Sequence, residues 1–112
     1  MIVRRERTKS KYHNIKVELN GFRFDSKKEA QRYRELLIME KAGLIANLTI
    51  HPEFKIEING EKICKYCGDF SYTLREKFGK FIVEDVKGIK TAVYRLKKKL
   101  MLACLGIEIR EI

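Results

Sequence analysis

Two Asn-Gly pairs, Asn20-Gly21 and Asn59-Gly60, each separate short runs in which apolar and polar residues alternate. Such a pair readily adopts the positive φ angles of a two-residue β-turn, and alternation is typical of a strand with one buried face. The first pair predicts a β-hairpin over about 15–25. The second predicts that the run 53–58 folds back on the run 62–74, with 81–87 as a third consecutive antiparallel strand.

In two other segments the apolar residues recur with the period of a helix. The first segment predicts a helix over 27–42, which Gly43 is placed to end, and the second predicts a helix that begins after Gly88. A short strand over 107–112 then closes the chain. The apolar stripes are formed by Ala30, Tyr33, Leu36, Leu37 and Leu44 in the first helix, and by Val93, Leu96, Leu100 and Cys104 in the second. The order of hairpin, helix, three strands, helix and strand belongs to the α/β (α+β) class.

The 112 residues fit one domain, and their charge is concentrated at the two ends. Residues 1–28 carry nine basic and three acidic side chains, and residues 87–112 carry seven and two, within a net charge of +10. A field of this sign attracts phosphate backbones, although a solvated basic surface without a partner is the alternative. We expect residues 1–11 to form a basic flexible arm. The candidate DNA-binding residues are Arg4, Arg5, Arg7, Lys9, Lys11, Lys27, Lys28, Lys90, Arg95 and Lys98.

The apolar segments argue against a membrane protein. None approaches the roughly 18 residues that span a bilayer, and the first residues lack the apolar core of a signal peptide. We therefore expect a soluble, cytoplasmic protein with no membrane partner.

The strand 81–87 carries the most informative acids. Alternation places Asp85 and Lys87 on one face and Glu84 on the other, so we expect Glu84 to tolerate replacement by Gln with activity retained. Asp69 lies among strand-forming residues on the preceding strand, where antiparallel pairing can set it beside Asp85. Buried carboxylates so close repel each other unless a cation such as Mg²⁺ lies between them. The alternative is a plain salt bridge between Asp85 and Lys87.

A cation held by two carboxylates, with positions left for water and phosphate oxygen, is suited to phosphodiester hydrolysis. Lys87 can steady the attacking water and the charge that develops on the phosphate. Glu29 is a further candidate because it falls inside the apolar stripe of the first helix and should point towards the sheet. A capping box, in which Ser26 caps the helix and Glu29 reaches back to it, also explains this spacing.

The cysteines and histidines carry weaker signals. Cys64 and Cys67 have the spacing of half a zinc site or a redox pair, but no second paired motif accompanies them, so buried reduced thiols are expected. His51 precedes Pro52 and is interpreted as structural. His13 lies in the basic arm, where it can touch phosphate.

Four segments together resemble a known superfamily. "FDSKKEAQRYREL", "CGDF", "IVEDVKG" and "YRLKKKL", in this order, resemble the PD-(D/E)XK nuclease superfamily. More closely, they resemble a family of small phage and prophage proteins, formerly of unknown function, over about 11–112. The chain departs from the superfamily pattern at Gly68, where a proline precedes the first aspartate in the name motif.

The resemblance implies a restriction-endonuclease-like α-β-β-β-α-β core that binds Mg²⁺ or Mn²⁺ and cleaves DNA. It implies that Glu29, Asp69, Asp85 and Lys87 are catalytic, with Glu29, both aspartates and the backbone carbonyl of Val86 on the metal. Small phage members are similar to Holliday-junction resolvases, which implies a homodimer selective for branched DNA. Two alternatives remain open: a non-catalytic nucleic-acid-binding module, and a subunit of a larger nuclease or transposase complex.

Overall fold

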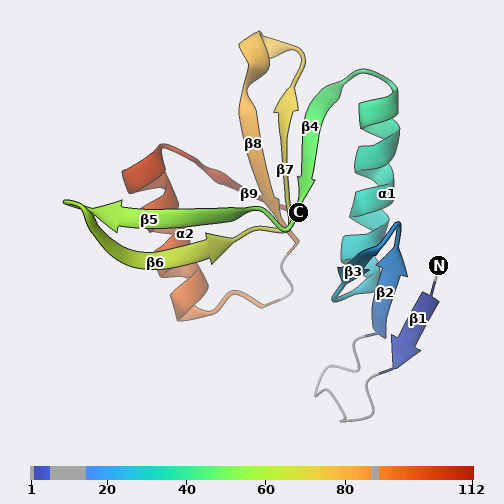
Figure 1. Cartoon of the computed structure of the whole chain (residues 1–112), viewed down its shortest axis with the longest axis horizontal. Helices are drawn as coiled ribbons and strands as arrows, with labels where there is room; N and C mark the ends of the chain where they lie inside the picture. Colours follow the sequence, from blue (N-terminus) through green and yellow to red (C-terminus); the bar gives the residue numbers. More distant parts are fainter. Residues whose placement is uncertain (1, 6–14, 87–88) are drawn as a thin grey trace.

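A computed structural model describes residues 2–5, 15–86 and 89–112, and their side chains except those of 2–5, 15 and 77. The chain alternates short strands with two longer helices, as Figure 1 shows. The elements are β1 (Ile2–Arg5), β2 (Ile15–Leu19), β3 (Phe22–Phe24), α1 (Lys27–Lys41), β4 (Ile45–Ile50), β5 (Glu53–Ile58), β6 (Glu61–Cys67), β7 (Phe70–Leu74), a short 3-10 turn (Lys77–Gly79), β8 (Phe81–Asp85), α2 (Ala92–Leu105) and β9 (Ile109–Glu111).

A mixed sheet with the strand order β4-β7-β8-β9 forms the centre of the molecule. β7 pairs antiparallel with β4 and β8, whereas β9 returns through α2 to pair parallel with β8. Along the chain, α1, β4, β7, β8, α2 and β9 therefore follow the predicted α-β-β-β-α-β order. The α/β (α+β) class and the N-terminal hairpin of β2 and β3 are confirmed.

The strands that fill this order differ from the prediction. β4 was not predicted, and the run 62–74, predicted as one strand, is interrupted at Gly68 and Asp69. β6 pairs with β5 in a separate hairpin, and β7 belongs to the central sheet. A Cβ at Gly68 would lie 3.1 Å from Val83 Cγ1, so glycine suits this close approach to β8 and a larger residue would require Val83 to shift. Asp69 N then donates to Glu84 O at 3.0 Å, which fixes the start of β7.

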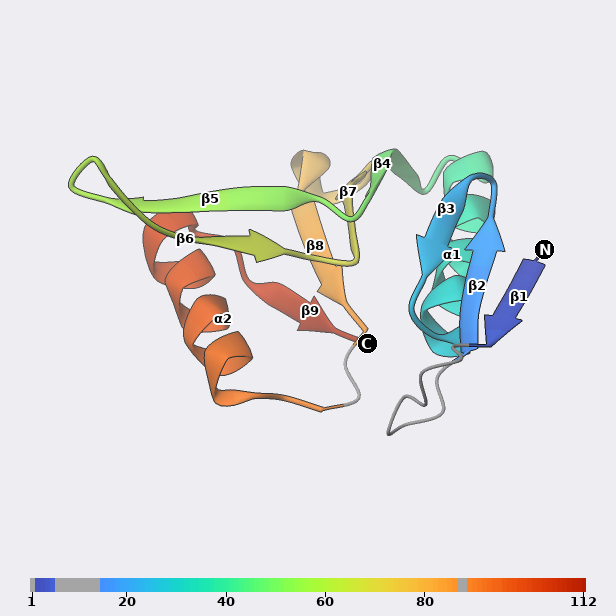
Figure 2. The same ribbon diagram turned by 60° about the horizontal axis from the view of Figure 1, so that its bottom comes forward.

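The two faces of the central sheet are covered by different elements, as Figures 1 and 2 show. α1 and the N-terminal hairpin pack on one face, where Tyr33 and Phe24 join Ile82 of β8 in a hydrophobic cluster. α2 and the β5–β6 hairpin cover the other face, where Met101 and Tyr66 pack with Val83. Successive residues of β8 thus enter different cores, as strand alternation requires.

Helix α2 buries a different face from the one that its apolar spacing predicted. Val93 and Leu96 were expected to be buried but are 63% and 58% exposed, whereas Tyr94 and Met101 are buried. The helix carries apolar residues on more than one side. The side that is buried is the one on which Met101 packs in a cluster with Val83 and Ile109. Apolar spacing alone did not distinguish these sides.

The N-terminal segment differs in part from the predicted arm. Residues 2–5 form β1, which pairs antiparallel with β2, while residues 1 and 6–11 lie outside the described residues. In the described part of the chain, no helix is long and apolar enough to cross a membrane.

Candidate metal centre

Three side chains that bind metals in proteins converge where β4 ends and β7 begins. Among the described residues, Glu29, His51 and Asp69 bring one ligand atom each to within 4.8 Å of one another. His51 Nε2 lies 3.1 Å from Glu29 Oε1. Because His51 is 43% exposed, the centre opens to solvent on this side.

Local backbone structure sets each of these positions. Ser26 caps α1 by accepting a hydrogen bond from Glu29 N at 3.1 Å, which places the buried Glu29 in the first turn. His51 follows β4 with a left-handed φ of 53°, and its N–H donates to Asp69 O at 2.9 Å. The end of β4 is therefore tied to the residue that precedes β7.

Burial and neighbouring charges perturb the carboxyl group of Asp69. Burial, followed by the charge of Glu29, raises the pKa of Asp69 to about 8, and the charge of Asp85 adds to this shift. The N–H of Val86 donates to Asp69 Oδ2 at 2.6 Å and opposes the shift. Its surroundings therefore favour the protonated form of Asp69.

Asp85 lies beside Asp69 and is almost fully buried. Its Oδ2 accepts a hydrogen bond from the hydroxyl of Tyr66, a residue of the β5–β6 hairpin. Burial and the bond to Asp85 raise the pKa of Tyr66, so its hydroxyl remains a donor. The hairpin thus orients one acid of the site.

The chain matches one protein-family model over residues 9–105, a model described as "Protein of unknown function (DUF1064)". The chain belongs to this family. The matched segment contains Glu29, His51, Asp69 and Asp85, so all four acidic and imidazole groups lie within the DUF1064 region. No curated protein and no solved structure matches the chain.

The structure of this DUF1064 member brings Glu29 and Asp69 together and sets Asp85 next to them. Val86 was predicted to contribute its carbonyl, and its N–H is bonded to Asp69. Lys87 lies outside the described residues. Sequence reasoning missed His51 because β4 was not recognised: the register that pairs Ile50 with Phe70 places the next residue, His51, beside Asp69.

Glu84 leaves the face of β8 opposite to Asp85, as predicted, but its carboxylate has bonding partners of its own. It is fully buried and accepts hydrogen bonds from Arg32 Nε at 2.8 Å, Arg32 Nη2 at 2.6 Å and the Tyr72 hydroxyl. Its hydrogen bond to Arg32 raises the pKa of the guanidinium. The Arg32–Glu84 ion pair joins α1 to β8. Because Arg32 lies one helical turn after Glu29, this ion pair also helps to position Glu29 near Asp69.

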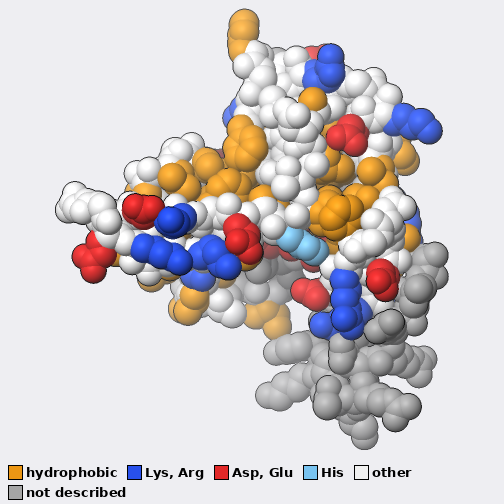
Figure 3. Space-filling model, in the orientation of Figure 1, with side chains coloured by type: hydrophobic (Ala, Val, Ile, Leu, Met, Phe, Trp, Pro, Cys, Tyr) orange, Lys and Arg blue, Asp and Glu red, His pale blue; other side chains and the backbone are white. Residues whose placement is uncertain are grey.

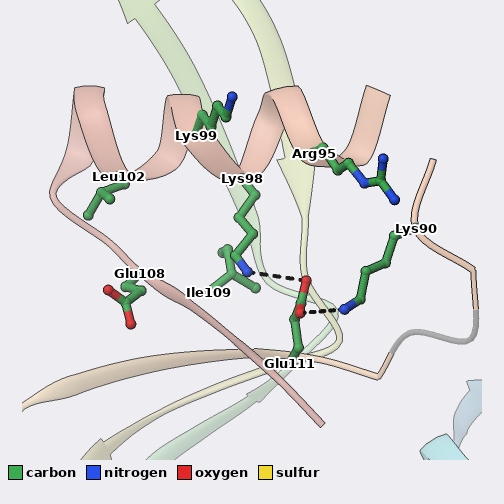
Figure 4. A pocket seen from close by; sticks show the side chains of 8 residues that line it. All are labelled: Lys90, Arg95, Lys98, Lys99, Leu102, Glu108, Ile109 and Glu111. Atoms are coloured by element: carbon green, nitrogen blue, oxygen red, sulfur yellow. Dashed lines mark ion pairs between the residues drawn. The ribbon is translucent and has the colours of Figure 1, made fainter. Parts of the chain in front are cut away.

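The described basic candidates fall into separate groups. Lys27 and Lys28 are exposed at the start of α1, and Lys90, Arg95 and Lys98 line a hollow beside α2, shown in Figure 4. Arg4 and Arg5 belong to β1, and Arg7, Lys9 and Lys11 lie outside the described residues. Figure 3 shows that Lys and Arg side chains also gather over the β5–β6 hairpin, with acidic side chains among them.

The three cysteines are free thiols. Cys67 is exposed, contrary to the buried position expected, and its Sγ lies 3.9 Å from Glu53 Oε2. Cys64 and Cys104 are partly buried. Within the described residues, cysteine belongs to no group of three metal-binding side chains, and the candidate group offers only oxygen and nitrogen atoms.

Proposed function

We propose that this protein is a metal-dependent DNA endonuclease that hydrolyses phosphodiester bonds with Mg²⁺ or Mn²⁺. The observation that carries the proposal is the convergence of Glu29, His51 and Asp69 within 4.8 Å, with Asp85 adjacent. Packing several acids together in a partly buried site is unfavourable unless protons or a cation compensate their charge. A hard divalent cation suits such oxygen ligands, and the imidazole makes Mn²⁺ a good occupant.

Glu29, His51, Asp69 and Asp85 would hold the ion, and the carbonyl of Val86 completes the proposed set. When bound, such an ion lowers the pKa of a water molecule and stabilises the charge that develops on phosphate oxygens. The chain supplies the orientation: the Val86 N–H holds Asp69, and the Tyr66 hydroxyl holds Asp85. Lys87, two residues after Asp85, is proposed to bind the phosphate and steady the attacking water.

We further infer that the family is a branch of the PD-(D/E)XK superfamily. The α-β-β-β-α-β order and the acids at the ends of β7 and β8 support this inference. We propose branched DNA, such as a Holliday junction, as the substrate, in phage DNA processing in the cytoplasm of a bacterial host. A homodimer would present one centre to each of the two strands that such a junction offers for cutting.

The test uses a labelled four-way junction and a linear duplex of matched sequence, each with Mg²⁺, Mn²⁺ or EDTA. We expect metal-dependent cutting, with the junction preferred. Asp69→Asn should abolish it, whereas the matched change Glu57→Gln, on the exposed β5 strand, should leave it intact. Absence of cutting on every substrate in both metals overturns the proposal, and salt-sensitive binding without cutting supports the non-catalytic module instead.

A further inference from the structure

A hollow of about 420 Å³ lies between α2 and β9. Figure 4 shows cationic side chains around it from α2 and from the segment that precedes α2. Its lining residues are Lys90, Arg95, Lys98, Lys99, Leu102, Glu108, Ile109 and Glu111. Four cations against two acids leave the hollow positively charged.

Glu111 joins two of these cations. Lys90 Nζ lies 3.0 Å from its Oε1 and Lys98 Nζ lies 3.2 Å from its Oε2, and the Tyr94 hydroxyl donates to Oε2 at 2.7 Å. Both lysines therefore point into the hollow, as Figure 4 shows. An ammonium group has three N–H donors, so each lysine keeps donors for a further acceptor after binding Glu111.

The other charged residues of the hollow are less constrained. Arg95 and Lys99 are exposed and have no acidic partner in the part of the chain that the structure describes. Glu108 is exposed and, among these same residues, forms no ion pair. Arg95 presents a planar set of donors that matches a phosphate group.

The hollow lies beside Asp85, the acid that neighbours Asp69 of the candidate metal centre. Glu111 is the register partner of Asp85 in the parallel β8–β9 pair, so the two side chains leave the same face of the sheet on neighbouring strands. Ile112 N also donates to Asp85 O at 3.0 Å. A nucleic-acid strand that reaches Asp85 along this face of the sheet would pass the hollow.

We propose that the hollow is a phosphate-binding subsite for a nucleic-acid strand and that Glu111 is a positioning residue that holds Lys90 and Lys98 for it. The choice of DNA as the strand rests on the proposed function. Phosphate capture itself requires neither a divalent cation nor cleavage. Glu111 remains charged at neutral pH because the Tyr94 hydroxyl and the two lysines lower its pKa to about 2.

Removal of Glu111 is expected to change nucleic-acid affinity in the direction opposite to the one that net charge alone predicts. Removing an acid from a surface that binds a polyanion ordinarily tightens binding. Here Glu111→Gln should weaken binding of a fluorescent four-way junction in EDTA. The expected loss of affinity is roughly two- to fivefold, which corresponds to the free energy of an exposed ion pair. Glu108→Gln removes the same charge from the same hollow and should bind as tightly as the wild type or more tightly.

Two further variants test the subsite. Glu111→Asp keeps the charge but shortens the side chain, so it should also weaken binding while circular dichroism stays that of the wild type. Lys98→Ala should lower the slope of log affinity against log salt by about one.

Equal or tighter binding by Glu111→Gln relative to Glu108→Gln overturns the subsite, even if the wild type cuts DNA. A wild type that binds in this way but never cuts overturns only the proposed hydrolysis.

Discussion

At the scale of single residues, Asp69 is a carboxylic acid whose surroundings favour its protonated form. Its pKa of about 8, raised by burial and by Glu29, lies above the ordinary value of 3.8, so folding favours the neutral form. The folded state binds more protons than the unfolded state between these values. The contribution of Asp69 to the free energy of unfolding is therefore fully present below about pH 4 and is lost as the pH rises towards and through 8.

We expect urea unfolding in EDTA to show lower stability at pH 8 than at pH 5. Asp69→Asn removes the titrating group and should flatten this dependence. Mn²⁺ should restore stability at pH 8, because a bound ion replaces the proton. A wild-type stability that rises from pH 5 to pH 8 in EDTA contradicts the assignment.

His51 is the candidate ligand that sequence reasoning did not identify. If it binds the ion through Nε2, His51→Ala should lower Mn²⁺ affinity roughly tenfold or more in calorimetric titration. A control at Thr49, an exposed residue of β4, should leave the affinity unchanged. Unaltered binding by His51→Ala would show that the carboxylates hold the ion alone.

Glu84 shows where an inference from strand alternation was incomplete. Alternation correctly places Glu84 away from Asp85, but it does not reveal that Arg32 and Tyr72 bond to the buried carboxylate. Glu84→Gln leaves the guanidinium without its counter-charge and should lower the free energy of unfolding by ~3 kcal/mol. Glu35→Gln, which removes the exposed partner of Arg32, should cost less than about 1 kcal/mol. Equal stabilities of the two variants in urea would contradict this account.

At the scale of elements, the hairpins and helices could be predicted because their signals are local. Asn20-Gly21 and Asn59-Gly60 have the positive φ angles that their sequence favours, and Ser26 caps α1. β4 could not be recognised in the same way. Asn47 adopts a φ of 58° within it, and the pairing with β7 shifts at this point, so alternation is broken.

The break between β6 and β7 depends on a contact that is distant in sequence. Gly68 passes against Val83 of β8, so Gly68→Ala should push β8 or Asp69 away and lower both stability, by ~1–3 kcal/mol, and Mn²⁺ affinity. Val83→Ala in the same chain removes the clashing Cγ1 and should recover part of the affinity. An affinity unchanged by Gly68→Ala would mean that the site does not depend on this close approach.

At the scale of the whole molecule, the site is assembled from four elements that are far apart in the sequence. Glu29 belongs to α1, His51 follows β4, Asp69 precedes β7, and Asp85 ends β8. The sequence allowed the acids to be proposed because each lies at an atypical place in its element. The imidazole could not be proposed, because its proximity to the acids arises only from the register of β4 on β7.

The uneven charge of the chain predicts that DNA affinity and metal affinity depend on different residues. Replacing Arg7, Lys9 and Lys11 by Gln removes three charges from the basic N-terminal segment, whereas replacing Lys55, Lys62 and Lys65 removes three from the β5–β6 hairpin. Each phosphate contact contributes about 0.9 to the slope of log affinity against log salt. The magnitude of this slope should therefore fall by up to ~2.7 in the N-terminal variant and by less in the hairpin variant. The Mn²⁺ affinity should be unchanged in both variants. Equal slopes for the two variants would mean that net charge, rather than the N-terminal segment, determines DNA binding.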